Sequence, residues 1–281
     1  MKIYYVTGST NKKINLVKWP YRLKVGSSDL PNFEWEYTTV SSGLDGASIS
    51  AFSRGIKQGT AVLTIKGESR EAYYKAMNSF FEETERDLLN LKPGRLFIND
   101  SFLECYVVKS EKADWDLDYG ESDNQITVVA EYPYWCIDKL YQVFATEDGP
   151  VVSLFLDYPK AYLYDYTANP AVKMLINTNF VASAFRMVIY GPCVNPAITV
   201  GDNHYEVATS LLENEYLVID SRYKTIRAYT KTGIVRNEFN NQNKNYDIFE
   251  KIQVGENIVT RSALFGFDLH LMHERSEPLW M

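Results

Sequence analysis

The sequence predicts a mainly β protein with two domains: an N-terminal β-sheet domain with one α-helix and extended hairpins, and a C-terminal β-sandwich. Three observations predict this class. The chain has 281 residues, which corresponds to about two domains of roughly 150 residues each. Aromatic residues make up 14% of it, with 21 Tyr, and aromatic side chains favour strands. Short strand-like runs separated by turn residues fill most of the chain, and only one segment has the period of a long helix.

The charge and cysteine content exclude several classes of function. The net charge is −7, with 17 basic and 20 acidic residues in 1–140 and 12 and 16 in 141–281, so neither half offers the basic face that binds nucleic acid. The N-terminus has no signal-peptide pattern, and no apolar run approaches the roughly 18 residues of a membrane span. We therefore expect a protein made and kept in the cytoplasm, with no membrane partner. Cys105, Cys136 and Cys193 form no CxxC pair or disulfide framework, so we expect each to fill a small apolar position.

The first part of the chain predicts strands at about 2–7, 33–40 and 60–67. Between the last two lies the sequence SSGLDGASISAFSRGIKQG, residues 41–59, which is rich in Gly and Ser. This composition is typical either of a mobile connection or of an extended hairpin.

The predicted helix lies within residues 69–94. Apolar and small residues recur there at three- and four-residue spacing, which predicts one buried face: Tyr73, Met77, Phe80, Phe81, Thr84, Leu88 and Leu91. Ser69 can cap the start, and Pro93-Gly94 stops the helix. The opposite, hydrated face is expected to carry Glu82, Glu83, Glu85, Arg86 and Asp87.

After the helix, the runs RLFIND, FLECYVVKSEK and QITVVAEYPYW predict three more strands. Between the last two, Asp114, Asp116 and Asp118 match the first three ligand positions of an EF-hand loop. The match then fails, because Tyr119 stands where the turn glycine should be and Gln125 where the bidentate glutamate should be. Alternation of the aspartates with Trp115, Leu117 and Tyr119 instead predicts a long hairpin over 102–132 with one aromatic face, and no metal site.

The best domain boundary follows EYPYW, residues 131–135, which gives domains of 1–140 and 141–281. Beyond it, eight to ten short strands with frequent turns predict a two-sheet β-sandwich or jelly roll. The runs are VKMLIN, FRMVIYG, PAITVG, YEVATSLL, EYLVIDS, TIRAYT, FEKIQVGENIVTRSALF and FDLHLMHE.

No residue pattern predicts an enzyme or a cofactor site. In GPCVNPAITVGDNHY, residues 191–205, turn-forming pairs flank Cys193, and no basic group is near it in sequence except neutral His204. We expect this loop to be a hairpin with Asp202-Asn203 at its tip. His270 and His273 lie on a predicted strand, where residues three apart face opposite sides, so they are not expected to share a metal. Paired carboxylates, GxSxG and P-loop motifs are absent from the sequence.

The order of these parts resembles the distal tail protein of long-tailed phages that infect Gram-positive bacteria. The resemblance covers nearly the whole chain. Its segments are SGLDG before a strand and the helix, GRLFIND after the helix, PYW at the domain end, FRMVIYGPCVNPAITV, EYLVIDSRYKTIRAY, IFEKIQVGENIV, and the ending FDLHLMHERSEPLW.

The resemblance implies a structural protein of the tail tip or baseplate. In that family the N-terminal domains form a hexameric ring, with a helix and an extended hairpin between neighbours, and the C-terminal domain is a galectin-like β-sandwich. The ring joins the tail tube protein to the tail-associated hub or lysin protein, and in some members the outer domain carries receptor-binding proteins. The implied location is the virion tail tip, after assembly in the host cytoplasm.

By position, the ring elements of this chain would be the helix of 71–91 and the hairpins of 41–59 and 102–132. The candidate interface residues are Tyr73, Met77, Phe80, Phe81, Trp115, Leu117 and Tyr119. The alternative for these aromatic residues is ordinary core packing. Two other functions stay open: a carbohydrate-binding β-sandwich, which a row of exposed aromatic residues and measurable glycan binding would distinguish, and a cell-wall hydrolase fused to a sandwich.

Overall fold

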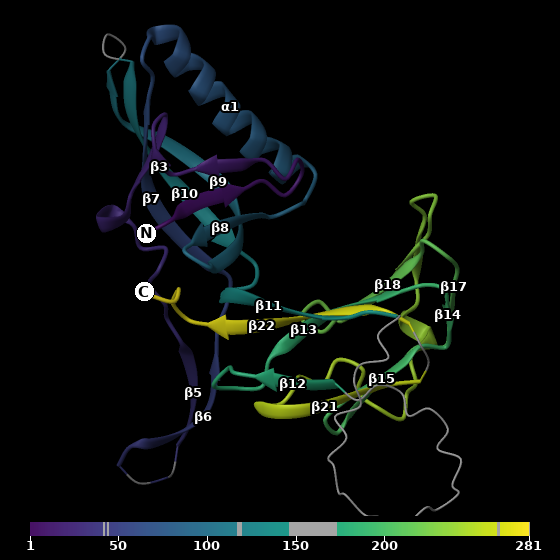
Figure 1. Ribbon diagram of the computed structural model, residues 1–281. Helices are drawn as coiled ribbons and strands as arrows, with labels where there is room; N and C mark the ends of the chain where they lie inside the picture. The colour runs from purple at the N-terminus through teal and green to yellow at the C-terminus, as the bar shows by residue number, and fades with distance from the viewer. Residues whose placement is uncertain (42, 44, 117–119, 146–172, 263–264, 281) are drawn as a thin grey trace, which may run out of the picture. The chain divides into compact units, whose positions relative to one another are not determined.

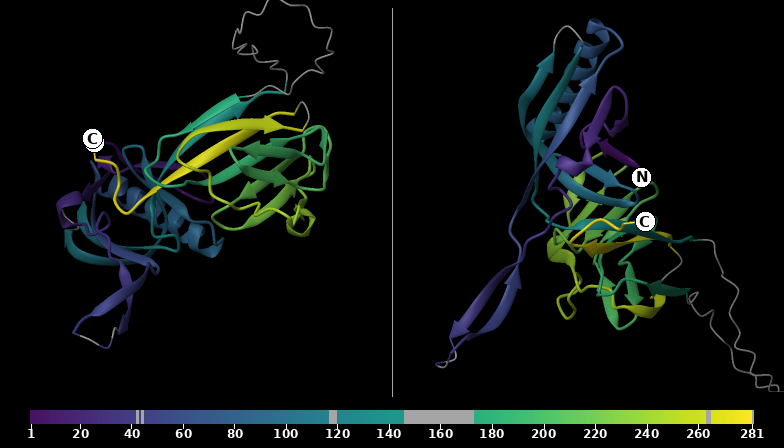
Figure 2. Two further views of the ribbon diagram at one scale, coloured as in Figure 1. Left: turned by 90° about the horizontal axis from the view of Figure 1, so that it is seen from below. Right: turned by 90° about the vertical axis from the view of Figure 1, so that its left-hand side faces the viewer.

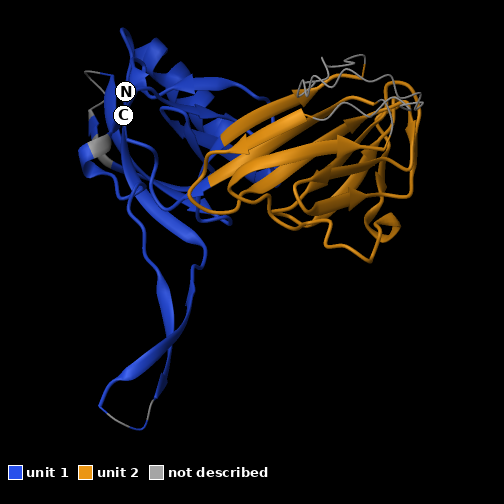
Figure 3. Ribbon diagram, turned by 60° about the horizontal axis from the view of Figure 1, so that its bottom comes forward, with its two compact units in different colours: residues 1–137, 274–281 blue, residues 138–273 orange. Residues whose placement is uncertain are grey.

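The computed structural model describes residues 1–41, 43, 45–116, 120–145, 173–262 and 265–280. The chain divides into two compact units (Figure 3). Unit 1 comprises residues 1–137 and 274–281, and unit 2 comprises residues 138–273. The sequence suggested one boundary near residue 140, whereas the chain passes between the units twice, because its last residues belong to unit 1.

Unit 1 contains antiparallel strands and one long helix (Figure 1). One series of paired strands is β3 (Val17–Lys18), β4 (Tyr21–Lys24), β7 (Lys57–Lys66), β10 (Glu121–Ala130) and β9 (Ser101–Asp116). The start of β9 pairs in turn with β8 (Gly94–Ile98), which continues to β1 (Ile3–Val6) and β2 (Lys13–Asn15). A short 3₁₀ turn, η1 (Val25–Ser27), follows β4. The long strand β9 therefore joins two groups of strands.

Helix α1 (Arg70–Leu89) is the predicted helix. Ser69 caps it, with its hydroxyl accepting a hydrogen bond from the Ala72 N–H at 3.2 Å. The helix buries Tyr73 and Phe80 in a core that also contains Leu63 of β7 and Leu103 of β9. The hydrophobic effect of this burial attaches the helix to the sheet, in agreement with the predicted apolar face.

Two predictions for the helix were wrong. Asp87 is completely buried although it was expected on the hydrated face, because the loop of residues 7–10 closes over that side of the last turn. Leu91 lies beyond the helix with a φ of 50° and is 82% exposed. The helix ends at Leu89 and is capped by Asn90, before Pro93 is reached.

Residues 36–53 form an extended hairpin, one of the two alternatives for residues 41–59, but its first strand lies mostly in the segment 33–40 that was predicted as a separate strand. Strand β5 (Glu36–Ser41) pairs with β6 (Ala47–Ser53) in a two-stranded sheet that pairs with no other described strand. The hairpin extends from unit 1 as a separate ribbon (Figure 2). We call residues 33–56 the arm. The second predicted hairpin, β9–β10, is also present, and its residues 117–119 lie outside the described part of the chain.

Unit 2 is a sandwich of two sheets. Strands β11 and β22 each belong partly to both units. The residues of β11 from 138 onward and the residues of β22 up to 273 belong to unit 2. The larger sheet has the order β11 (Trp135–Val143), β22 (Phe267–Arg275), β13 (Ala184–Tyr190), β18 (Tyr216–Asp220), β19 (Thr225–Tyr229), β20 (Val235–Asn237). The smaller has the order β12 (Lys173–Asn177), β21 (Gly255–Arg261), β15 (Ala197–Val200), β16 (Asn203–Glu206).

The core of unit 2 contains side chains from both sheets. Phe185 and Leu269 of the larger sheet and Ile198 and Tyr205 of the smaller one are all 0% exposed. A short pair, β14 (Cys193–Val194) with β17 (Ser210–Leu211), and a 3₁₀ turn, η2 (Phe239–Asn241), complete the unit. Unit 2 therefore has the mainly β sandwich architecture that the turn and strand pattern predicts.

Two details of unit 2 differ from the sequence prediction. The β15–β16 turn is formed by Gly201-Asp202, one residue earlier than expected, because Gly201 adopts the positive φ of 61° that the first turn position requires. In the run 249–265, the described strand is only β21, which begins at Gly255 with a φ of 92°.

Candidate assembly surfaces

The arm exposes many large apolar side chains. Every residue of β5 and β6 is exposed, although a strand of a folded domain normally buries one face. The large exposed apolar side chains of the arm are Phe33, Trp35, Tyr37, Val40, Ile49, Phe52 and Ile56. An isolated two-stranded hairpin is at best marginally stable in water, so this arrangement favours a partner that covers it.

The cross-strand register places the larger side chains of the arm on one face. Tyr37 pairs with Phe52, and Thr39 pairs with Ile49 beyond a β-bulge. Paired residues share a face, and so do residues two apart on one strand, so Tyr37, Phe52 and Ile49 lie together. Tyr37 is 64% exposed and Phe52 61%. We call this the apolar face of the arm.

The base of the arm is held to unit 1 by aromatic and cationic side chains. The guanidinium of Arg54 lies 5.2 Å from the ring of Trp35 and 4.8 Å from the ring of Tyr134. Its Nη1 donates to Ser276 Oγ at 3.4 Å, which ties the arm to the C-terminal segment. Desolvation lowers the pKa of Arg54, but a guanidinium remains charged at neutral pH. Cation–π contact compensates part of this desolvation.

An open hollow of about 410 Å³ lies beside this base. Its charged lining residues are Asp29, Glu34, Glu36, Arg54 and Lys57. Several of these groups already have partners: Asp29 accepts hydrogen bonds from the N–H and hydroxyl of Thr60, and Lys57 donates to the carbonyl of Asn32. The lining therefore carries both signs of charge and favours no single ionic ligand.

The helical candidate residues divide into two groups. Tyr73 and Phe80 are 1% and 2% exposed, so the core of unit 1 occupies their side chains and they offer almost no surface to another chain. Met77 and Phe81 are half-buried at the edge of that core. Lys112 of β9 lies over the ring of Phe81, with Nζ 4.6 Å from its centroid.

Trp115, the candidate interface residue of the β9–β10 hairpin that the structure describes, lies close to Met77 of α1. Trp115 is 55% exposed and pairs across the strands with Ser122, whose hydroxyl lies 3.6 Å from Met77 Sδ. Met77 and Trp115 therefore lie on the same side of the hairpin. Leu117 and Tyr119 fall outside the described residues.

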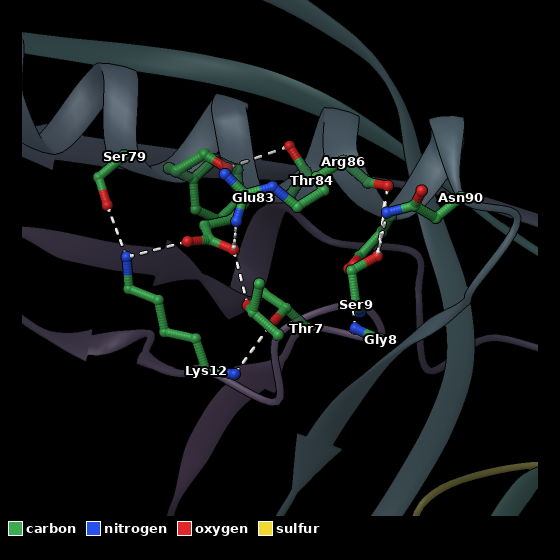
Figure 4. A network of polar contacts seen from close by, with 12 residues as sticks. Thr7, Gly8, Ser9, Lys12, Ser79, Glu83, Thr84, Arg86 and Asn90 are labelled. Carbon is green, nitrogen blue, oxygen red and sulfur yellow. Dashed lines mark hydrogen bonds and ion pairs between the residues drawn. The ribbon is translucent and has the colours of Figure 1, made fainter. Parts of the chain in front are cut away.

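A polar network fixes the last turns of α1 to the loop of residues 7–12 (Figure 4). The buried Asp87 carboxylate accepts hydrogen bonds from the N–H groups of Gly8 and Ser9, at 3.0 and 2.7 Å, and from the hydroxyl of Tyr5 at 3.1 Å. A Cβ at Gly8 would lie 2.3 Å from the Lys92 carbonyl oxygen, so only glycine permits this approach.

The exposed side of the same network is ionic. Glu83 accepts from Thr10 Oγ1 at 2.7 Å, and Lys12 Nζ lies 3.5 Å from its other carboxylate oxygen and 2.8 Å from Ser79 Oγ (Figure 4). The Thr10 hydrogen bond, together with Lys12 and Arg86, lowers the pKa of Glu83. The network thus fixes the helix from its C-terminal half, and it was not predicted from the sequence.

The cysteine and histidine of the 191–205 loop have separate environments. His204 lies with Nδ1 3.1 Å from Thr199 Oγ1 and Nε2 3.3 Å from Glu206 Oε2. Cys193 pairs in register with Leu211, and burial raises the pKa of its thiol, which disfavours the reactive thiolate. His270 bonds the Asp138 carboxylate at 2.9 Å, while His273 is buried, and both lie on β22 as predicted.

Among the described residues, no three His, Cys, Asp or Glu side chains lie closely enough together to hold a metal ion. The described part of the chain also contains no helix with the length and apolarity needed to cross a membrane.

Sequence reasoning missed the apolar face of the arm. A signal was present: Phe33, Trp35 and Tyr37 alternate with glutamates, the period-two pattern of a strand with one apolar face. That pattern also fits an ordinary half-buried strand, so it could not distinguish a core face from an exposed one.

The structure is similar to those of phage baseplate and hub proteins. A chain of the phage p2 baseplate in its activated conformation with Sr is 14% identical with a TM-score of 0.66, over 99% of both chains. A chain of the same baseplate with Ca is 14% identical with a TM-score of 0.66, and the match covers 99% of this chain and 100% of that one. The SPP1 Dit (gp 19.1) protein, described as a paradigm of the hub adsorption apparatus in phages infecting Gram-positive hosts, is 7% identical with a TM-score of 0.54, over 97% and 99%.

No protein-family model matches the sequence, and no curated protein matches it significantly. The likeness therefore lies in the fold, which extends over nearly the whole length of the chain. At the level of fold, the predicted resemblance to a phage distal tail protein is confirmed.

Proposed function

We propose that this protein is a structural subunit of a phage tail tip, which forms a hub ring between the tail tube and the tail-associated hub protein. The observation that carries the proposal is the arm: a hairpin with both strands exposed and an apolar face of Tyr37, Ile49 and Phe52. The shared fold with the phage p2 baseplate chain and the SPP1 hub protein supports the setting.

The arm fits a contact between neighbouring copies in a closed ring. A ring requires two different surfaces on each subunit, since a head-to-tail contact with a closing rotation makes a ring while a self-complementary patch makes a dimer. The arm supplies one surface. The edge of α1 with Met77, Phe81 and Trp115 is a second apolar surface in unit 1, distinct from the arm in sequence and in sheet. The hexameric number, the tail-tip location and assembly in the host cytoplasm follow from the family resemblance alone.

Solution mass combined with negative-stain images tests this proposal. We expect particles with a central hole, either for the protein alone at high concentration or after addition of its tail tube and hub partners. A protein that stays monomeric at every concentration and also in the presence of both partners contradicts the proposal. Platform contacts with receptor-binding proteins would be a property of unit 2, and co-purification of those proteins with unit 2 alone tests them separately.

A further inference from the structure

The outer face of the larger sheet of unit 2 carries a row of three tyrosines. Tyr190 of β13 pairs in register with Tyr216 of β18, and Tyr216 pairs with Tyr229 of β19. Three neighbouring strands of the sheet, β13, β18 and β19, therefore place tyrosines side by side on one face. Tyr190 is 41% exposed and Tyr216 36%. The exposure of Tyr190 and Tyr216 leaves part of this row accessible among the described residues.

The tyrosine rings are arranged unevenly along the row. Tyr216 and Tyr229 stack with centroids 4.8 Å apart and an angle of 9° between their planes. Tyr190 instead turns toward β22, where its hydroxyl donates to Asp268 Oδ2 at 2.8 Å. Because Tyr190 leans away from β18, the face of Tyr216 toward β13 is not covered by a stacked ring among the described residues.

Beyond Val188 and Val218, and on the neighbouring strand β22, the same face carries polar and charged residues. Gln142 Nε2 donates to Asp268 Oδ1 at 3.2 Å, and Arg186 lies in register between His270 of β22 and Asp220 of β18. Burial and the hydrogen bond to Asp268 raise the pKa of Tyr190 to about 12, so its phenol stays protonated and able to donate. The face that carries the tyrosine row thus also carries a carboxylate, a guanidinium and an amide, which together donate and accept hydrogen bonds.

Charge on this face favours a neutral ligand. The face carries both signs of charge, because the acidic side chains Asp138, Asp220 and Asp268 lie among the basic side chains Arg186 and Arg227. Neither a polyanion nor a cation would meet a face of opposite sign. The apolar residue beside Tyr216 on this face, Val218, is only 6% exposed, so the accessible surface around Tyr216 is mainly aromatic and polar.

We propose that this face binds a neutral glycan chain, with one pyranose ring on Tyr216 and hydroxyls of the same or neighbouring sugar units bonded to Asp268 and Arg186. A sugar ring has an apolar C–H face and a polar rim, so it matches an aromatic ring bordered by hydrogen-bonding groups. The proposal does not depend on ring assembly, because every residue named belongs to unit 2. A failure of one proposal is therefore distinguishable from a failure of the other.

Binding of the full chain to an array of neutral and anionic oligosaccharides, followed by calorimetry on the best neutral one, tests the site. We expect millimolar or tighter binding of at least one neutral oligosaccharide and none of polyglycerol phosphate. Tyr216→Ala should weaken binding by about tenfold or more, whereas Tyr216→Phe, which keeps the ring, should bind within a few-fold of wild type. Asp268→Asn removes a charged acceptor without removing a ring and should also weaken binding.

Tyr246→Ala is the matched control, because Tyr246 is 51% exposed in the same unit but contacts His204 of the smaller sheet. It should bind like the wild type. Should Tyr216→Ala unfold, Asp268→Asn and Tyr229→Ala decide the question. The proposal is overturned if no neutral oligosaccharide binds, if the folded variants bind like the wild type, or if the face proves to bind another tail protein and no sugar.

Discussion

At the scale of single residues, Asp87 has the largest predicted effect on stability. Its carboxylate is fully buried and accepts three hydrogen bonds, from Tyr5, Gly8 and Ser9. Asp87→Ala leaves these donors without an acceptor and should lower the free energy of unfolding of unit 1 by about 2–4 kcal/mol. Asp87→Asn retains one acceptor oxygen and should cost less. Denaturant unfolding followed by fluorescence measures both changes.

Glu85→Ala is the control for this prediction, because Glu85 is exposed on the same helix, two residues away. It should change the free energy of unfolding by less than about 0.5 kcal/mol. Equal effects of the two alanine variants would show that the buried network contributes nothing beyond helix propensity.

Glu83 should make the stability of unit 1 depend on acid pH. Its pKa in the folded protein is lowered below 4.5, first by the Thr10 hydrogen bond and then by Lys12 and Arg86. A lowered folded pKa means that the unfolded state binds the proton more readily, so the stabilisation is present above the unfolded pKa and is lost as the pH falls through the folded one. We expect Glu83→Gln to be less stable than the wild type at pH 7 and the difference to shrink toward pH 3. A difference that stays constant over this range would contradict the prediction.

Cys193 and His204 should be dispensable. His204 bonds Thr199 and Glu206, and Cys193 is a half-buried free thiol, so the double change to alanine should cost roughly 1–2 kcal/mol and leave assembly intact. Thermal unfolding and particle mass check this. A folded double variant that loses a chemical activity of the wild type would contradict the structural interpretation of this loop.

At the scale of elements, the sequence could predict the helix because its signals are local. The period of the apolar residues, the Ser69 cap and the Pro93-Gly94 stop all lie within 26 residues of chain. The burial of Asp87 could not be predicted in the same way, because its partners lie 78 to 82 residues away in sequence. Likewise, an extended hairpin was one of two alternatives for residues 41–59, but whether its faces are buried or exposed depends on distant strands, which no local pattern reports.

The arm gives the element-scale prediction. Tyr37→Ser with Phe52→Ser removes the two largest side chains of the apolar face, both already exposed, so the variant should fold with nearly unchanged stability. If the arm joins neighbouring copies, this variant should lose ring assembly, because aromatic side chains at an interface centre supply much of its binding energy. Tyr246→Ser, a change at a tyrosine of unit 2 that is also more than half exposed, should assemble normally. If the double variant assembles like the wild type, the arm does not form the contact between neighbouring copies.

At the scale of the whole molecule, a division into two parts could be predicted from turn spacing, whereas the return of the C-terminus to unit 1 could not. The return begins inside β22, whose last two residues, Glu274 and Arg275, already belong to unit 1, and the strand pattern shows no break there. The place of residues 274–280 is set by long-range contacts: Tyr132 donates to Glu274 at 2.5 Å, and the Leu279 N–H donates to Ser101 Oγ at 2.9 Å. No local signal in the sequence reports such pairs.

This return predicts how fragments of the chain behave. Residues 138–273 hold a complete two-sheet core, so this fragment should be a monomer that unfolds cooperatively. Residues 1–137 alone lack the partners of Tyr132, Ser101 and Arg54, and should be measurably less stable than the same fragment joined to residues 274–281 through a Gly-Ser linker. The joined fragment, which contains the arm, should also form closed oligomers at high concentration or with the tail tube and hub partners. Denaturant unfolding and light scattering on the three fragments test both statements. Equal stability of the two unit 1 fragments would show that the C-terminal segment does not stabilise unit 1. If residues 138–273 form oligomers while the unit 1 fragment never associates, the ring contacts belong to unit 2.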